Sequence, residues 1–92
     1  MKKKPGDEQV TFLRGVVDGC VRAIAEHEDQ VRIEQDVTPM RVVFSLYMAP
    51  SDVGLVLGKG GATLDAVRRV VWTACKKTDL HCDIDLITDG RR

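Results

Sequence analysis

The feature that most constrains this chain is a run of glycines, Gly58-Lys59-Gly60-Gly61, between two stretches with helical patterns. Before this glycine loop (residues 58–61), Pro50 suits the first turn of a helix, because its φ is already helical and its missing N–H would have no partner there. After the loop, apolar residues recur every three or four positions; they are Leu64, Val67, Val71, Ala74 and Cys75. Because glycine enters left-handed conformations without a Cβ penalty, we expect a tight turn between two helices, with Gly58 ending the first.

The start of the second predicted helix favours an anion, because unpaired N–H groups and the positive end of the helix dipole lie there. Spacing excludes two familiar phosphate-binding loops. A Walker loop has four residues between its first glycine and Gly-Lys-Ser/Thr, whereas three separate Gly54 from Gly58 and no hydroxyl follows Lys59. A dinucleotide fingerprint starting at Gly58 needs a glycine where Thr63 stands, and a strand before its turn.

The run from Leu57 to Leu64 places Gly-x-x-Gly between two helical patterns, with an apolar residue on each side. It resembles the KH domain, in which such a loop clamps about four nucleotides by their backbone. Residues without side chains let sugar and phosphate come close to main-chain donors, which agrees with the resemblance. A glycine-rich turn between helices is most often only a turn, so the argument also depends on the surrounding elements.

The chain before the first strand has the pattern of an amphipathic helix, predicted from Asp7 to about His27. Its apolar stripe consists of Val10, Leu13, Val16, Val17, Cys20, Val21 and Ile24. Gly15 and Gly19 lie four positions apart within it. This spacing lets another backbone come close, either the domain's own sheet or a second copy of the chain.

Three strands complete the pattern. Alternation predicts a half-buried strand over 31–37 and another over 41–48, joined by a turn at 38–40 into an antiparallel hairpin. A third strand is predicted from Leu80 to near Thr88. The order helix, strand, strand, helix, helix, strand predicts an α+β domain of two layers, in which helices cover one face of a three-stranded mixed sheet.

This order of elements is similar to that of the type II, or bacterial, KH fold over about residues 8–88. The run from Ala49 to Gly61 is particularly similar to the small single-KH RNA-binding proteins of the KhpA family. We therefore expect a single KH domain at 8–88, between a flexible N-terminal tail at 1–7 and a frayed C-terminal tail at 89–92.

The resemblance also implies roles for particular residues. Gly58 and Gly61 would allow the close approach of an RNA backbone, with Lys59 and Gly60 at the exposed tip. The other implied RNA-binding residues are Val53, Val56 and Leu57 as an apolar groove, Ala62 beside the loop, and Arg68 and Arg69 as phosphate contacts. The three apolar residues could equally belong to the core, and the two arginines to a solvated face.

Two positions depart from the family, which often has a polar residue at Gly60 and an arginine at Ala62. We therefore expect a looser loop and weaker RNA binding. Trp72 lies at the margin of the apolar stripe, where a half-buried packing role is favoured over a base-stacking platform.

The formal net charge is zero, which argues against tight non-specific binding of nucleic acid. The charges are nevertheless unevenly distributed. Between positions 58 and 77, the five cations Lys59, Arg68, Arg69, Lys76 and Lys77 outnumber the single acid Asp65, whereas four aspartates follow within 78–90. A basic helix flank beside an acidic strand predicts oriented binding over a small footprint.

We predict no catalytic or metal site. Cys20, Cys75 and Cys82 are odd in number and form no C-x-x-C pair, so reduced core cysteines fit best. A metal site of Cys75, His81 and Cys82 is disfavoured, because strand alternation directs His81 and Cys82 to opposite faces. No histidine pairs with a nucleophile and no carboxylates converge, so we expect no enzyme, no cofactor and no small-molecule substrate.

Neither a signal peptide nor a membrane span is predicted, so we expect a cytoplasmic protein. Our first hypothesis is a non-catalytic module that binds single-stranded RNA. The family resemblance implies a role in post-transcriptional regulation or as an RNA chaperone, links to bacterial cell shape and cell-wall biogenesis, a homodimer, and a larger KH-containing partner. The alternative is a protein-interaction adaptor with a KH fold and little RNA binding, which zero net charge and Ala62 favour.

Overall fold

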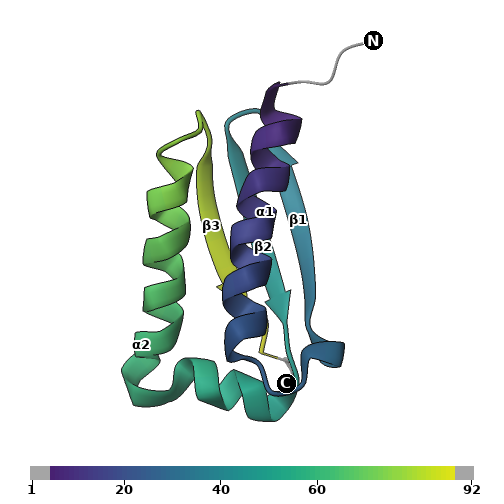
Figure 1. The fold of residues 1–92 in the computed structure, drawn as a ribbon, viewed down its shortest axis with the longest axis vertical. Helices are drawn as coiled ribbons and strands as arrows, with labels where there is room; N and C mark the ends of the chain where they lie inside the picture. Colours follow the sequence, from purple (N-terminus) through teal and green to yellow (C-terminus); the bar gives the residue numbers. More distant parts are fainter. Residues whose placement is uncertain (1–4, 89–92) are drawn as a thin grey trace.

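The computed structural model describes residues 5–88. Its elements in chain order are α1 (Pro5–Ile24), the 3-10 helix η1 (Glu28–Gln30), β1 (Arg32–Thr38), β2 (Arg41–Tyr47), α2 (Pro50–Cys75) and β3 (His81–Leu86) (Figure 1). The predicted order is confirmed, except that the two helices expected around the glycine loop form one bent element, α2. The helix α1 also begins within the predicted tail; the remaining predicted tail residues, 1–4 and 89–92, lie outside the described residues.

The sheet has the order β1-β2-β3, with β2 in the centre. β1 pairs with β2 in antiparallel fashion, as predicted for the hairpin, and Gln35 lies opposite Phe44. β2 pairs with β3 in parallel, with Phe44 opposite Ile84. Figure 1 shows α1 and the second part of α2 side by side over one face of this mixed sheet. The predicted two-layer α+β architecture is therefore confirmed.

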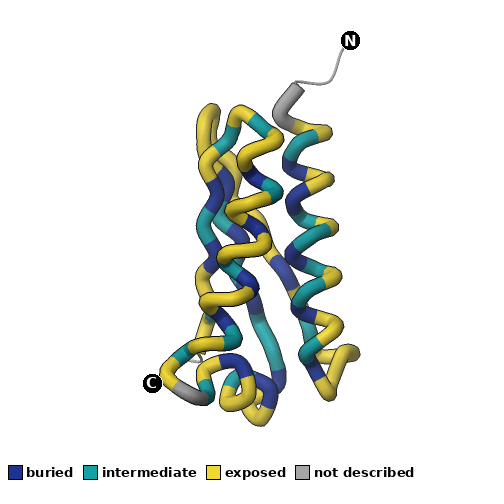
Figure 2. The backbone as a smooth tube through the Cα atoms, turned by 60° about the vertical axis from the view of Figure 1, so that its left-hand side comes forward, coloured by how far each residue is buried: buried dark blue, intermediate teal, exposed yellow. Residues whose placement is uncertain are grey.

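The core lies between these two layers. On both helices the buried positions recur at the predicted helical spacing, and on β2 and β3 they alternate (Figure 2). The buried core residues of α1, β2 and β3 are Val10, Leu13, Val17, Val21, Val42, Phe44, Leu46, Cys82 and Ile84. Those of α2 are Val56, Leu64, Val67, Val71 and Cys75. Local periodicity therefore located most of the core correctly.

The structure differs from the sequence-based expectations at one strand and excludes one of the two alternatives for the glycines of α1. Ile33 is the only buried residue of β1, and Val37 is 48% exposed, because this strand lies at the sheet edge. Gly15 and Gly19 are exposed, and a Cβ added to either would meet nothing within 4 Å. These glycines therefore do not serve to let α1 pack closely against the domain's own sheet.

Candidate nucleic-acid interface

The glycine loop is a corner within α2. Gly60 and Gly61 have φ values of 70° and 82°, whereas an α-helix has φ near −63°. Figure 1 shows the consequence: the first segment of α2 (residues 50–57) runs along the lower end of the molecule, and the second segment (residues 62–75) runs upward past β3. The predicted tight turn is confirmed, but its left-handed residues are Gly60 and Gly61 rather than Gly58.

The surface of the loop is open. Gly60 and Ala62 are exposed, and Gly58 and Gly61 are half-buried; the side chain of Lys59 lies outside the described part of the chain. A Cβ added to Gly60 or Gly61 would meet nothing within 4 Å, so these positions need glycine for backbone conformation rather than for space. The second segment of α2 starts here, and the positive end of its dipole therefore faces whatever contacts the loop.

The first segment of α2 divides its apolar residues between the core and the surface. Val56 is 3% exposed and belongs to the core cluster, so it cannot form the wall of an open groove as the resemblance implied. Val53 is half-buried, and Leu57, next to the loop, is 43% exposed. Leu55, which the sequence analysis did not single out, is 46% exposed. Leu57 and Leu55 thus offer apolar surface near the loop.

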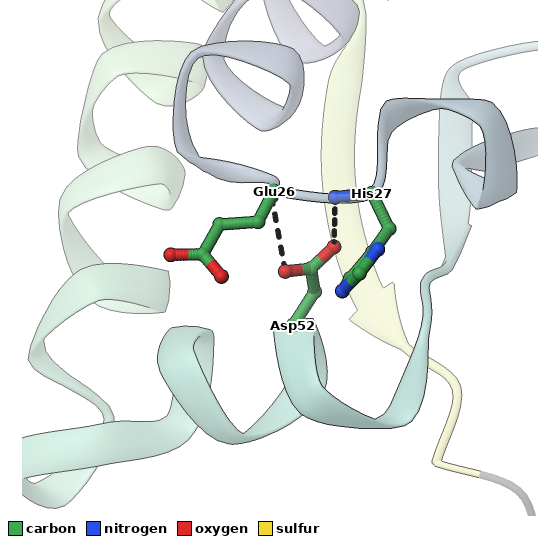
Figure 3. A group of neighbouring side chains, drawn as sticks. All are labelled: Glu26, His27 and Asp52. Atoms are coloured by element: carbon green, nitrogen blue, oxygen red, sulfur yellow. Dashed lines mark hydrogen bonds between the residues drawn. The ribbon is translucent and has the colours of Figure 1, made fainter.

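Asp52 fixes the position of this first segment. It has no exposed surface, and its two carboxylate oxygens accept hydrogen bonds from the backbone N–H groups of Glu26 (3.0 Å) and His27 (2.9 Å) (Figure 3). Burial alone would raise the pKa of Asp52, but these two donors and the charge of His27 hold it below its ordinary value. The link joins the chain after α1 to the start of α2. No local sequence pattern indicates this link, because its partners lie 25 and 26 positions away from Asp52.

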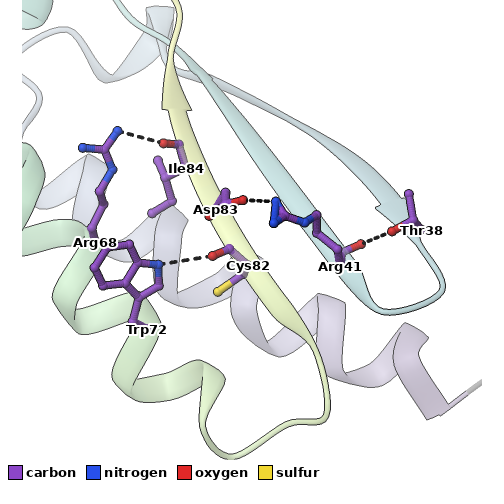
Figure 4. Close-up of polar contacts among 7 residues, drawn as sticks. All are labelled: Thr38, Arg41, Arg68, Trp72, Cys82, Asp83 and Ile84. Carbon is purple, nitrogen blue, oxygen red and sulfur yellow. Dashed lines mark hydrogen bonds and ion pairs between the residues drawn. The ribbon is translucent and has the colours of Figure 1, made fainter.

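Arg68 and Trp72 reach from α2 to the free edge of β3 (Figure 4). Nη2 of Arg68 donates to the carbonyl of Ile84 at 3.1 Å, and Nε1 of Trp72 donates to the carbonyl of Cys82 at 3.2 Å. Arg68 Nη1 also lies 3.6 Å from a carboxylate oxygen of Asp65. Arg68 is therefore a structural residue rather than the free phosphate contact that the resemblance implied.

Arg69 remains available, unlike its neighbour. Its side chain is exposed and, with Ala62, Asp65 and Ala66, lines a cavity of about 260 Å³. Since Ala62 directly follows the loop, this cavity lies beside it. Of the predicted phosphate contacts beyond the loop, the geometry thus favours Arg69 alone.

The cysteines and the histidine near β3 do not converge on a metal site. His81 is exposed and Cys82 is buried, as strand alternation predicted. Burial and the neighbouring Cys75 raise the pKa of the Cys82 thiol to about 12, which keeps it protonated and unreactive. Glu26, His27 and Asp52 also approach one another, but the Asp52 oxygens already accept two backbone N–H groups.

Among the helices within residues 5–88, none has a segment that is both long and apolar enough to cross a membrane.

Comparison with known proteins agrees with the fold. The family described as KhpA/KhpB, KH domain, matches residues 14–86. The chain is 31% identical over 75 residues to the RNA-binding protein KhpA of Halalkalibacterium halodurans, covering 82% of this chain and 99% of that protein. It is 35% identical over 73 residues to RNA-binding protein KhpA of Leifsonia xyli subsp. xyli (79% of this chain, 96% of that protein), and 31% identical over 62 residues to that of Bacillus subtilis (67% and 76%).

The family match spans the glycine loop, all three strands and most of both long helices. It also agrees with the prediction of a non-catalytic protein. The corner at Gly60 and Gly61, the mixed sheet and these similarities lead to one assignment: this chain belongs to the KhpA/KhpB family of KH domains.

Proposed function

We propose that this protein is a non-catalytic binder of single-stranded RNA, in which the glycine loop clamps the sugar–phosphate backbone. The observation that carries the proposal is the exposed corner with two left-handed glycines at the start of a long helical segment. The space around Gly60 and Gly61 is open, and a phosphate bound there would lie at the positive end of a helix dipole. The similar proteins named above are described as RNA-binding, which supports the same ligand.

The residues around the loop suggest how the strand would be held. Gly58, Gly60 and Gly61 provide backbone contact, and the loop sequence includes one cation, Lys59. Leu57 offers exposed apolar surface for a base, and Arg69 a guanidinium for a phosphate beyond Ala62. With so few cations, the affinity should depend only weakly on salt, because each neutralised phosphate contributes a slope of about −0.7.

Around this site we propose the wider organisation that the family resemblance implies. Residues 8–88 act as one KH domain of a cytoplasmic protein, which forms a homodimer and joins a larger KH-containing protein. Its role is in post-transcriptional regulation or RNA chaperoning, with effects on cell shape and cell-wall biogenesis.

The direct test changes the loop and asks whether RNA binding is lost. We expect the double variant Lys59→Asp/Gly60→Asp to lose ultraviolet crosslinking to single-stranded RNA, because negative charge and side chains would occupy the phosphate site. Circular dichroism should show an intact fold, since a single aspartate tolerates the left-handed region better than most residues.

A matched control has the same change in net charge away from the loop and from Arg69. Val70→Asp/Lys77→Asp alters one exposed position on the opposite flank of α2 and one just past its end, and should retain crosslinking. Unchanged crosslinking in the loop variant would reject the clamp.

A second candidate function is a protein-interaction adaptor, which one exposed surface of α1 favours. Phe12 is 43% exposed and lies at helical spacing from the exposed Gly15 and Gly19, which leave room for a second backbone. Under this proposal the wild type forms an oligomer, and Phe12→Ala lowers its solution molar mass, measured by light scattering. RNA crosslinking is absent in both the wild type and the variant.

A further inference from the structure

Trp72 is the only tryptophan of the chain, and it is 48% exposed although it lies against the sheet. Its indole N–H donates to the carbonyl of Cys82, which fixes the edge of the ring against β3 and leaves about half of the side chain in contact with solvent (Figure 4). A ring held in this way is oriented and accessible. These are the two properties that base stacking requires.

Trp72 lies on the same flank of α2 as the end of the glycine loop. Residues three or four apart share a helix face, and such steps connect Ala62, Asp65, Arg69, Trp72 and Lys76. The cavity of about 260 Å³ contains the first three of these residues, and a second cavity, of about 450 Å³, contains the last two together with the start of β3. This flank, which we call the tryptophan track, spans about 15 Å from Ala62 to Trp72.

The charges along the tryptophan track suit an RNA strand. Arg69 and Lys76 are exposed and flank Trp72, and among the described residues neither has an acidic partner within 4.0 Å. Two of the acids near them are engaged, since Asp65 faces Arg68 and Asp83 forms an ion pair with Arg41, whereas Asp79, which lines the second cavity, has no ion pair among the described residues. An indole between two free cations matches the alternation of base and phosphate along a single strand.

We propose that Trp72 is a stacking platform for a base of the RNA strand that continues from the glycine loop, with Arg69 and Lys76 binding the phosphates on either side. This inference rests on the proposed function and adds a second contact to it. It implies a dependence on RNA length. A strand of about four nucleotides, the length that a KH loop clamps, occupies the loop alone, whereas a strand of about ten also reaches Trp72.

Because the protein has one tryptophan, its intrinsic fluorescence reports on this site directly. We expect an unstructured RNA of about ten nucleotides to quench the emission of Trp72, and one of about four to bind without quenching. Fluorescence anisotropy of labelled RNA gives the affinities. Trp72→Ala should weaken binding of the longer strand about tenfold and leave the shorter one unchanged. Trp72→Phe, which keeps an aromatic ring, should retain most of the increase in affinity from the shorter to the longer strand.

The control and the loop variant separate this inference from the proposed function. Val70→Ala removes exposed apolar surface from the opposite flank of the same helix and should change neither affinity. The stacking platform is rejected if the longer strand binds without quenching Trp72 fluorescence. It is also rejected if Trp72→Ala still binds the longer strand more tightly than the shorter one by the same factor as the wild type. If neither strand binds the wild type, the proposed function and the platform fail together; if only the platform fails, Lys59→Asp/Gly60→Asp still abolishes binding of both strands.

Discussion

At the scale of single residues, Asp52 shows how one buried carboxylate can position a binding loop. Its two oxygens accept hydrogen bonds from the backbone N–H groups of Glu26 and His27, just after the end of α1. A buried charge is tolerated only when it is hydrogen-bonded in this way. The start of α2, and with it the direction in which its first segment leads to the glycine loop, therefore depends on this side chain.

We predict that Asp52→Asn lowers the melting temperature at pH 7 by several degrees, because the amide NH2 that replaces one carboxylate oxygen cannot accept a hydrogen bond from a backbone N–H. The pKa of Asp52 is lower in the folded than in the unfolded protein, so its contribution is complete above the ordinary value of 3.8 and is lost as the pH falls below it. The difference between wild type and variant should therefore shrink in acid.

Thermal melts at pH 7, 5 and 3, followed by circular dichroism, measure this difference. The neighbouring exposed residue Ser51 provides a control, since Ser51→Ala should not change the pH dependence. Equal melting temperatures of wild type and Asp52→Asn at pH 7 would contradict the role of this carboxylate.

Replacing two of the glycines of α2 by alanine should change the free energy of unfolding in opposite directions. Gly61 has φ of 82°, where a side chain costs about 1–2 kcal/mol, so Gly61→Ala should destabilise the fold by that amount. Gly54 is exposed, lies outside the left-handed region and has free space around it, so Gly54→Ala should stabilise by up to about 1 kcal/mol. Urea unfolding measures both values. Stabilisation by Gly61→Ala would show that the corner is not required.

At the scale of elements, α2 links the loop to the sheet. Its first segment is fixed by Asp52, its corner presents the loop, and its second segment contributes Leu64, Val67 and Val71 to the core. The same segment covers outward-facing carbonyls of β3 through Arg68 and Trp72. An uncovered strand edge invites pairing with another chain, so this contact also protects the sheet.

Replacing either of two adjacent arginines of α2 by alanine should therefore have different effects on stability and on RNA affinity. Arg68→Ala removes a charged donor from the Ile84 carbonyl and should cost roughly 1–2 kcal/mol of stability. Arg69→Ala removes an exposed cation, so its stability should change by less than about 0.5 kcal/mol while RNA affinity falls. Urea unfolding and RNA anisotropy on both variants give the four values. The assignment is wrong if Arg69→Ala is the more destabilised of the two.

At the scale of the whole molecule, the two faces of the sheet differ in charge. The helix-covered face of the sheet is apolar, whereas the register places Glu34, Asp36, Asp83 and Asp85 on the open face. Only part of this negative charge is balanced there, by Arg32 and Arg41. An RNA strand should avoid the open face of the sheet and bind at the loop and along α2.

The sequence allowed prediction of the features that depend on local patterns. Helical spacing located the buried side of α1, alternation located that of β2, and the glycines located the corner. Local patterns do not reveal contacts between distant residues. The bonds of Asp52 join residues 26 and 25 positions apart, and Arg68 was predicted to be free because nothing near it in sequence indicates the Ile84 carbonyl.

The measurement that tests the central claim most directly is an NMR titration of the ¹⁵N-labelled protein with an RNA of about four nucleotides. The account predicts that the largest shifts occur at the backbone amides of residues 58–62, with small changes on β1 and on the exposed side of α1. Undisturbed amides at 58–62, with the main changes at Phe12, Gly15 and Gly19 or on the open face of the sheet, would contradict it.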